Sequence, residues 1–165
     1  MRKFKTEFKW GLIFMGASLA WMLLERITGL HSTHIEKHAI YTNFFAIIAI
    51  AVYVFALRDK KHSDLGGKMT YKEGFVSGVI ISVVVAVLSP FGQLITAYVI
   101  SPHYFQNAID HGVSNGLATL AEAEAYFNLT NYIIQSTIFA PVMGVITSAA
   151  VAFFLRTKPA GSALD

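Results

Sequence analysis

The sequence predicts an all-α integral membrane protein with four transmembrane helices. Of its 165 residues, 55% are hydrophobic and only 14% are charged. In soluble domains, about a quarter of all residues are charged. The charges are also clustered, so that long stretches of the chain carry none. Such a chain cannot cover a water-exposed surface, and its uncharged stretches are long enough to cross a bilayer.

Four apolar segments have the length of a membrane span. A helix rises about 1.5 Å per residue, so roughly 20 residues cross the hydrocarbon core. The predicted spans cover residues 10–30, 39–57, 74–100 and 132–155. None shows the alternation of polar and apolar residues that a transmembrane β-strand requires. We therefore expect helices, all within a single membrane domain of residues 1–165.

The placement of lysine and arginine predicts the orientation of the chain. Nearly all of the 13 basic residues lie before the first span, between the second and third, or after the fourth. Four spans put these three segments on one side, and the positive-inside rule makes that side the cytoplasm, with both termini there. The same placement explains the net charge of +3 without nucleic-acid binding, so no nucleic-acid partner is expected.

A cleavable signal peptide is the rival interpretation of the first span. Basic residues precede an apolar run that ends in Ser18-Leu19-Ala20, which resembles a cleavage site. Cleavage there would leave three spans and would place the basic loop of residues 58–72 on the wrong side for the charge rule. We therefore expect the first span to be retained.

The outer segment of residues 101–131 differs from the spans. In its first half, apolar residues recur at helical spacing at Tyr104, Phe105, Ala108 and Ile109. In its second half, Thr119 and Glu122 have the spacing of a capping box, as do Thr70 and Glu73 at the start of the third span. We expect two short amphipathic helices that lie on the outer membrane face.

Small residues form stripes along the last two spans. In the third span Gly74, Gly78 and Ser82 share one helical face. In the fourth the corresponding face carries Ser136, Ala140, Gly144 and Thr147. Small residues allow the backbones of neighbouring helices to approach closely in a membrane. These stripes predict the packing seams of a four-helix bundle.

Polar side chains recur at similar depth in all four spans. The set comprises Glu25, Arg26, Asn43, Ser89, Gln93 and Gln135. Counted from the cytoplasmic ends, its members lie roughly 20–30 Å along their helices. This layer predicts either a vestibule that opens outward or a polar clasp within the bundle. Ionisable residues inside a span are functional candidates, although Glu25 and Arg26 lie close enough to the outer interface for a structural ion pair or headgroup anchor.

Three histidines follow the first span. His31, His34 and His38 are spaced three and four residues apart, so they share a face if this segment is helical. Imidazole is a common zinc ligand, and Glu36 adds a carboxylate nearby. No HExxH or cysteine motif accompanies them, and Gly29-Leu30 can break the helix. A metal site, a pH-responsive group and simple interfacial residues all remain open.

Several short motifs resemble a known family. Residues 58–61 (RDKK) end the second span, residues 69–75 (MTYKEGF) open the third, and residues 98–102 (YVISP) leave it. In these motifs, and over nearly the whole chain, the sequence resembles the small four-helix bacterial membrane proteins of a domain-of-unknown-function family (DUF4199). The resemblance implies the four-span topology and a place in the bacterial inner membrane. It implies no catalytic residue.

No catalytic constellation, phosphate loop or haem ligand pair is recognisable. The sequence therefore predicts a non-enzymatic protein without a cofactor, which acts by helix packing with itself or with other membrane proteins of the envelope. Two alternatives stay open. One is an oligomeric transporter or channel subunit that uses the polar layer, with kinks at Pro90 and Pro141. The other is metal binding on the outer face through His31, His34 and His38.

Overall fold

The computed structural model describes residues 4–158, and every regular element within that range is helical. Four helices are long and apolar enough to cross a membrane: Lys5–Ile27, Ile35–Asp64, Tyr71–Ile100 and Leu129–Leu155. The predicted all-α class with four spans is therefore confirmed. Arg2 and Lys3 of the basic N-terminus, and the last residues of the predicted domain, lie outside the described residues.

Some of the long helices contain local changes of helical type. The first long helix, α1 (Lys5–Ile27), and the last, α7 (Leu129–Leu155), are α-helical throughout. The second joins α2 (Ile35–Tyr41), the 3₁₀ turn η2 (Thr42–Phe44), α3 (Phe45–Asp59) and the π-helical turn η3 (Lys60–Asp64). The third joins α4 (Tyr71–Ile95) and the π-helical turn η4 (Thr96–Ile100). Because the second helix begins at Ile35 and not at residue 39, His38 lies on a helix.

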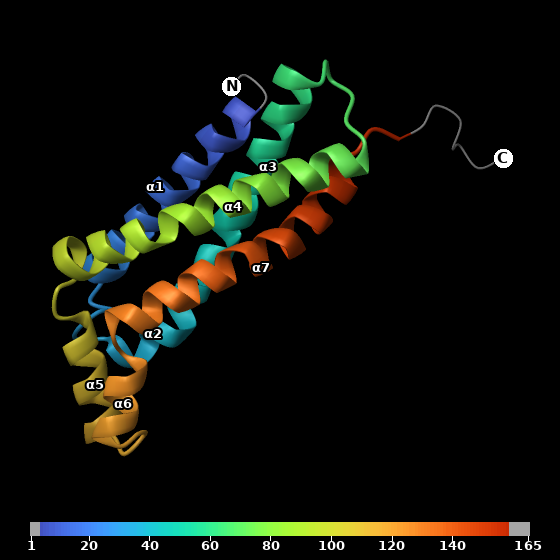
Figure 1. Ribbon diagram of the computed structural model, residues 1–165. Helices are drawn as coiled ribbons and strands as arrows, with labels where there is room; N and C mark the ends of the chain where they lie inside the picture. Colours follow the sequence, from blue (N-terminus) through green and yellow to red (C-terminus); the bar gives the residue numbers. More distant parts are fainter. Residues whose placement is uncertain (1–3, 159–165) are drawn as a thin grey trace.

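The bundle has two distinct ends (Figure 1). At one end, here called the proximal end, α1 begins, α7 finishes and the chain passes from α3 to α4. At the other, here called the distal end, lie α2 and the two short helices α5 (Tyr104–Ser114) and α6 (Leu120–Tyr126), which connect η4 to α7. The three basic segments of the sequence thus share the proximal end, as an even number of spans requires.

The helices α4 and α7 lie side by side (Figure 1) and approach closely at small residues. A methyl group added to Gly78 would overlap Ser148, and one added to Gly144 would overlap Ser82 and come 2.7 Å from Tyr53 Oη. The predicted seams of the third and fourth spans therefore face each other. Close backbone contact of this kind is a main source of helix association in membranes.

Capping boxes begin the two helices for which the sequence predicts them. At the start of α4, the Thr70 hydroxyl oxygen accepts a hydrogen bond from the Glu73 backbone N–H, and the Thr70 backbone N–H donates one to the Glu73 carboxylate. Thr119 and Glu122 do the same at the start of α6. Both boxes satisfy backbone N–H groups that have no partner within the helix.

We predict that Gly144→Ala destabilises the protein although alanine is the better helix former. The added methyl group has no room between Ser82 and Tyr53, and overpacking of this kind costs about 1–3 kcal/mol. Thermal unfolding in detergent measures the loss as a lower midpoint. The matched control is Gly16→Ala on α1, where a methyl group meets nothing within 4 Å and the midpoint should not fall. Equal midpoints for the two variants would contradict the packing account.

Candidate metal centre

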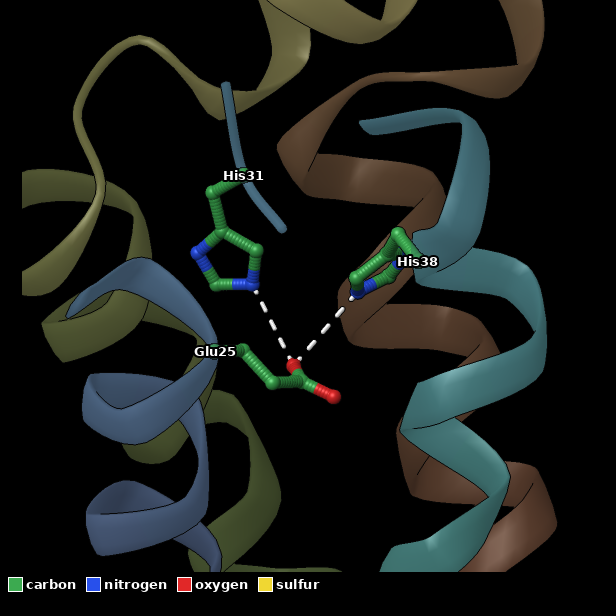
Figure 2. Close-up of side chains that lie close together, drawn as sticks. All are labelled: Glu25, His31 and His38. Carbon is green, nitrogen blue, oxygen red and sulfur yellow. Dashed lines mark hydrogen bonds and ion pairs between the residues drawn. The ribbon is translucent and has the colours of Figure 1, made fainter. Parts of the chain in front are cut away.

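A buried glutamate and two histidines meet at the distal end of the bundle (Figure 2). Glu25 lies in the last turn of α1, and its side chain is only 1% exposed. Its Oε2 atom is 3.2 Å from His31 Nε2 and 3.5 Å from His38 Nε2. The His31 side chain is 4% exposed and that of His38, on α2, is 19% exposed. Three separate segments therefore supply one buried cluster.

A glycine turn at the end of α1 brings His31 back over Glu25. Gly29 has a φ of +81°, in the left-handed region that favours glycine. The Leu30 N–H donates a hydrogen bond of 2.9 Å to the Glu25 carbonyl, five residues earlier, which is the bond that defines a Schellman turn. The chain consequently reverses at Gly29, and His31 stands above the last helical turn instead of continuing away from it.

Neighbouring side chains form hydrogen bonds to Glu25 and His38 through the atoms that do not face the cluster. Trp21 Nε1 donates a 2.7 Å hydrogen bond to Glu25 Oε1, which leaves Oε2 free to face the imidazoles. The Tyr104 hydroxyl lies 3.3 Å from His38 Nδ1 and 3.1 Å from the hydroxyl of Tyr132. Burial raises the pKa of Tyr104, so its hydroxyl stays protonated. It can accept from His38 Nδ1–H and donate to Tyr132.

The backbone of His31 is also fixed from the opposite side. Asn107 on α5 donates a 2.8 Å hydrogen bond from its side-chain amide to the His31 carbonyl. The His31 ring lies between those of His38 and Tyr104, with centroid distances of 5.3 and 4.9 Å. Its Nδ1 atom is buried and has no hydrogen-bond partner among residues 4–158. The ring position is therefore set by the contact of Nε2 with Glu25, by packing and by the backbone, not by a bond to Nδ1.

The arrangement fits a divalent transition metal. One ligand atom from each of Glu25, His31 and His38 lies within 4.8 Å of the others. In tetrahedral zinc sites with bonds of about 2.0–2.1 Å, neighbouring ligand atoms are roughly 3.3 Å apart, close to the 3.2 and 3.5 Å observed here. The bonds from Trp21 and Tyr104 resemble the outer contacts that orient metal ligands. The same distances also suit a hydrogen-bonded ion pair between Glu25 and a protonated histidine.

The structure groups the histidines differently from the sequence prediction. His34 does not join His31 and His38, because the segment after Gly29 forms turns and the helix begins only at Ile35. The His34 side chain is half-exposed and lies 4.0 Å from Glu36, which is exposed as well. The carboxylate that meets the two buried histidines belongs to Glu25, which the sequence analysis placed in the polar layer and not with the histidines.

The residues of the predicted polar layer have separate partners in the structure. Arg26 donates a hydrogen bond to the Ile100 carbonyl at the end of η4. Asn43 and Ser89 donate to the carbonyls four residues earlier on their own helices, at 2.7 and 2.9 Å. Gln93 lines a cavity beside His31 and His38, and Gln135 is half-buried on α7. Of this layer, Glu25 is the residue that meets the histidines.

A second buried carboxylate lies at the proximal end of α1. Glu7 is 1% exposed, and its Oε1 atom lies 2.9 Å from Lys60 Nζ and accepts a 2.8 Å hydrogen bond from Ser77. Its Oε2 atom is buried without a partner among the described residues. Sequence reasoning missed Glu7, although a signal exists: Glu7 and Glu25 are 18 residues apart, about five helical turns, and so share one face of α1.

Sequence reasoning also missed the residues that surround the cluster. Trp21 carries a signal, because it precedes Glu25 by one helical turn on the same face. The sequence predicts Tyr104 only as an apolar position of an interfacial helix, and Tyr132 only as the start of a span. Nothing in the sequence joins these two tyrosines to residues 31 and 38, because the contact depends on how α5 and α7 pack against α2.

Comparison with known proteins places the chain in a family. No curated protein and no solved structure matches it. The family described as Protein of unknown function (DUF4199) matches residues 9–157, which include all four long helices almost completely and every residue of the cluster. The resemblance noted in the sequence is thereby confirmed, and the chain belongs to the DUF4199 family.

Proposed function

We propose that this membrane protein binds a divalent transition metal, Zn²⁺ foremost, through Glu25, His31 and His38. One observation carries the proposal: a single buried carboxylate oxygen faces the Nε2 atoms of two imidazoles from different segments. Imidazole and carboxylate together suit zinc and its neighbours in the first transition row. The protein would hold the metal at the distal end of the bundle.

The balance of charge supports a cation at this point. A buried carboxylate needs a compensating charge, because an isolated ion is costly to remove from water. Without a metal, both histidines satisfy Glu25 Oε2 only if both present an N–H at Nε2. With a metal, both rings bind through an unprotonated Nε2 and keep Nδ1–H, which has Tyr104 as its acceptor at 3.3 Å on His38 and no acceptor among the described residues on His31.

We further propose that the protein lies in the bacterial inner membrane with both termini in the cytoplasm. The support is the distribution of charge: the basic segments share the proximal end, whereas residues 101–131 of the distal end contain neither Lys nor Arg. In this orientation the cluster of Glu25, His31 and His38 lies on the periplasmic side, close to the membrane surface.

Association with other membrane proteins and a transport role stay predictions, as does the absence of enzymatic activity. The small-residue stripes that suggested association are occupied within the chain, where Gly78 meets Ser148 and Gly144 meets Ser82. They are therefore no argument for an external partner. The metal site is preferred because it rests on a specific set of converging atoms.

Elemental analysis of the detergent-purified protein tests the metal site. With a purification tag free of histidine, we expect about one zinc or related metal per chain. Glu25→Gln and His31→Ala should abolish binding, because each removes one of three ligands. Tyr104→Phe removes an outer contact and should weaken metal affinity about 10–100-fold. Calorimetric titration of metal into chelator-treated protein gives these affinities.

His34→Ala is the matched control, because His34 is a histidine of the same segment that lies outside the cluster. Its metal content should equal that of the wild type. Metal that disappears equally with His34→Ala and His31→Ala would place the site elsewhere. Absence of metal after titration would leave the cluster as an ion pair and overturn the proposal.

The orientation is tested by labelling single cysteines, because the chain contains none of its own. Two exposed positions are replaced, one at a time: Asn115 at the distal end and Lys68 in the loop between α3 and α4. The variants are Asn115→Cys and Lys68→Cys. In intact spheroplasts, a membrane-impermeant maleimide should label Asn115→Cys and should label Lys68→Cys only after lysis. The reverse pattern would contradict the proposed topology.

A further inference from the structure

A cavity of about 210 Å³ adjoins the cluster on the side of the two histidines. His31 and His38 both line it, and it lies between the distal parts of α1, α2, α4, α5 and α7. A volume of this size accommodates a small organic molecule. The two imidazoles approach Glu25 Oε2 from either side (Figure 2), so a metal held by these three atoms would lie at the edge of the cavity.

The cavity has an aromatic side and a polar side. Tyr104, Phe105 and Tyr132 supply the aromatic rings. Thr42, Gln93 and Thr96 supply hydroxyl and amide groups. Hydroxyl and amide groups can donate hydrogen bonds, so this side suits a ligand that accepts hydrogen bonds and carries an apolar body.

The coordination chemistry points to the same cavity. Three protein ligands are typical of zinc sites that keep the fourth position for water or a substrate, whereas structural sites are closed by four. The described residues offer three ligand atoms here: one each from Glu25, His31 and His38. Because two of the three ligand residues line the cavity, we infer that the fourth position is reached from it.

The charge at the site sets the charge of the ligand. A divalent cation bound by one carboxylate and two neutral imidazoles retains one positive charge. No residue that lines the cavity is Asp, Glu, Lys or Arg, so nothing there neutralises it. Electrostatic attraction is strong where water is excluded. A monoanion therefore complements the site better than a neutral or cationic molecule.

We propose that this cavity binds a small organic monoanion, a carboxylate with a compact apolar body, as the fourth ligand of the metal. The carboxylate coordinates the metal and accepts hydrogen bonds from the polar side, while the apolar body packs against Tyr104, Phe105 and Tyr132. This inference rests on the proposed metal site. It makes that site a centre for ligand binding, not a structural clamp.

A second cavity, of about 300 Å³, lies on the other side of Glu25. Glu25 lines it together with Trp21, Leu24 and Lys37, but neither metal-binding histidine does. The Glu25 oxygen bound by Trp21 is Oε1, not the atom that faces the imidazoles. This second cavity supplies the matched control, because a substitution there alters a neighbouring space without reaching the proposed ligand.

The test is calorimetric titration of benzoate into the Zn²⁺-loaded and the chelator-treated full-length protein, with metal content measured for each sample. Benzoate should bind the metal-loaded form at least about tenfold more tightly, and acetate more weakly than benzoate because it lacks the apolar ring. Benzyl alcohol, a neutral molecule of similar shape, should show no dependence on the metal.

Two substitutions locate the site. Ala97→Phe fills the cavity, and Gln93→Leu removes an amide at similar volume, as a milder change if the first disturbs folding. Both should lower benzoate affinity by about tenfold or more while one metal per chain is retained. Leu24→Phe in the second cavity should leave benzoate affinity unchanged.

The outcomes separate the two proposals. Equal benzoate affinity with and without a bound metal would overturn this inference and leave the metal site intact. Benzoate binding that is lost with Leu24→Phe but kept with Gln93→Leu and Ala97→Phe would also overturn it, because the ligand would then occupy the second cavity. Failure to bind metal at all, seen in the metal content before any benzoate is added, would overturn the proposed function and this inference with it.

Discussion

The burial of one carboxylate, that of Glu25, sets the structure of the distal end. A carboxylate that is 1% exposed needs hydrogen bonds or a counter-charge at both oxygens. Neither water nor lipid supplies these partners, so the protein must. Trp21 satisfies one oxygen from within α1, and His31 and His38 face the other. The glycine turn after α1, the early start of α2 and the packing of α5 against both are arranged around this group.

The close packing of α4 against α7 determines what surrounds the cluster. Because Gly78, Ser82 and Gly144 allow these two helices to approach, the end of η4 and the beginning of α7 lie near each other at the distal end. The connecting segment folds there as α5 and α6, and it carries Tyr104 to His38 and Asn107 to His31. Packing far from the cluster thereby fixes the outer contacts of its ligands.

The first helix is joined to the second by buried polar contacts at both ends. Glu25 meets His38 at the distal end, and Glu7 meets Lys60 at the proximal end. The two glutamates share one face of α1 because about five turns separate them. If α1 slid along the second long helix, the Glu25–His38 and Glu7–Lys60 pairs would separate and leave buried polar groups without partners. The geometry of the candidate site therefore depends on both ends of α1.

The sequence by itself determined the class, the number of spans, the capping boxes and the small-residue seams, because these depend on local composition and helical periodicity. It also marked Glu25, His31 and His38 individually. Their grouping was decided by the tertiary structure. The spacing of the histidines suggested that His34 belongs with them, but the left-handed turn at Gly29 sends His34 outward and folds His31 back over Glu25. Tyr104 and Tyr132 join the histidines through contacts between helices distant in the sequence, and no periodicity encodes such contacts.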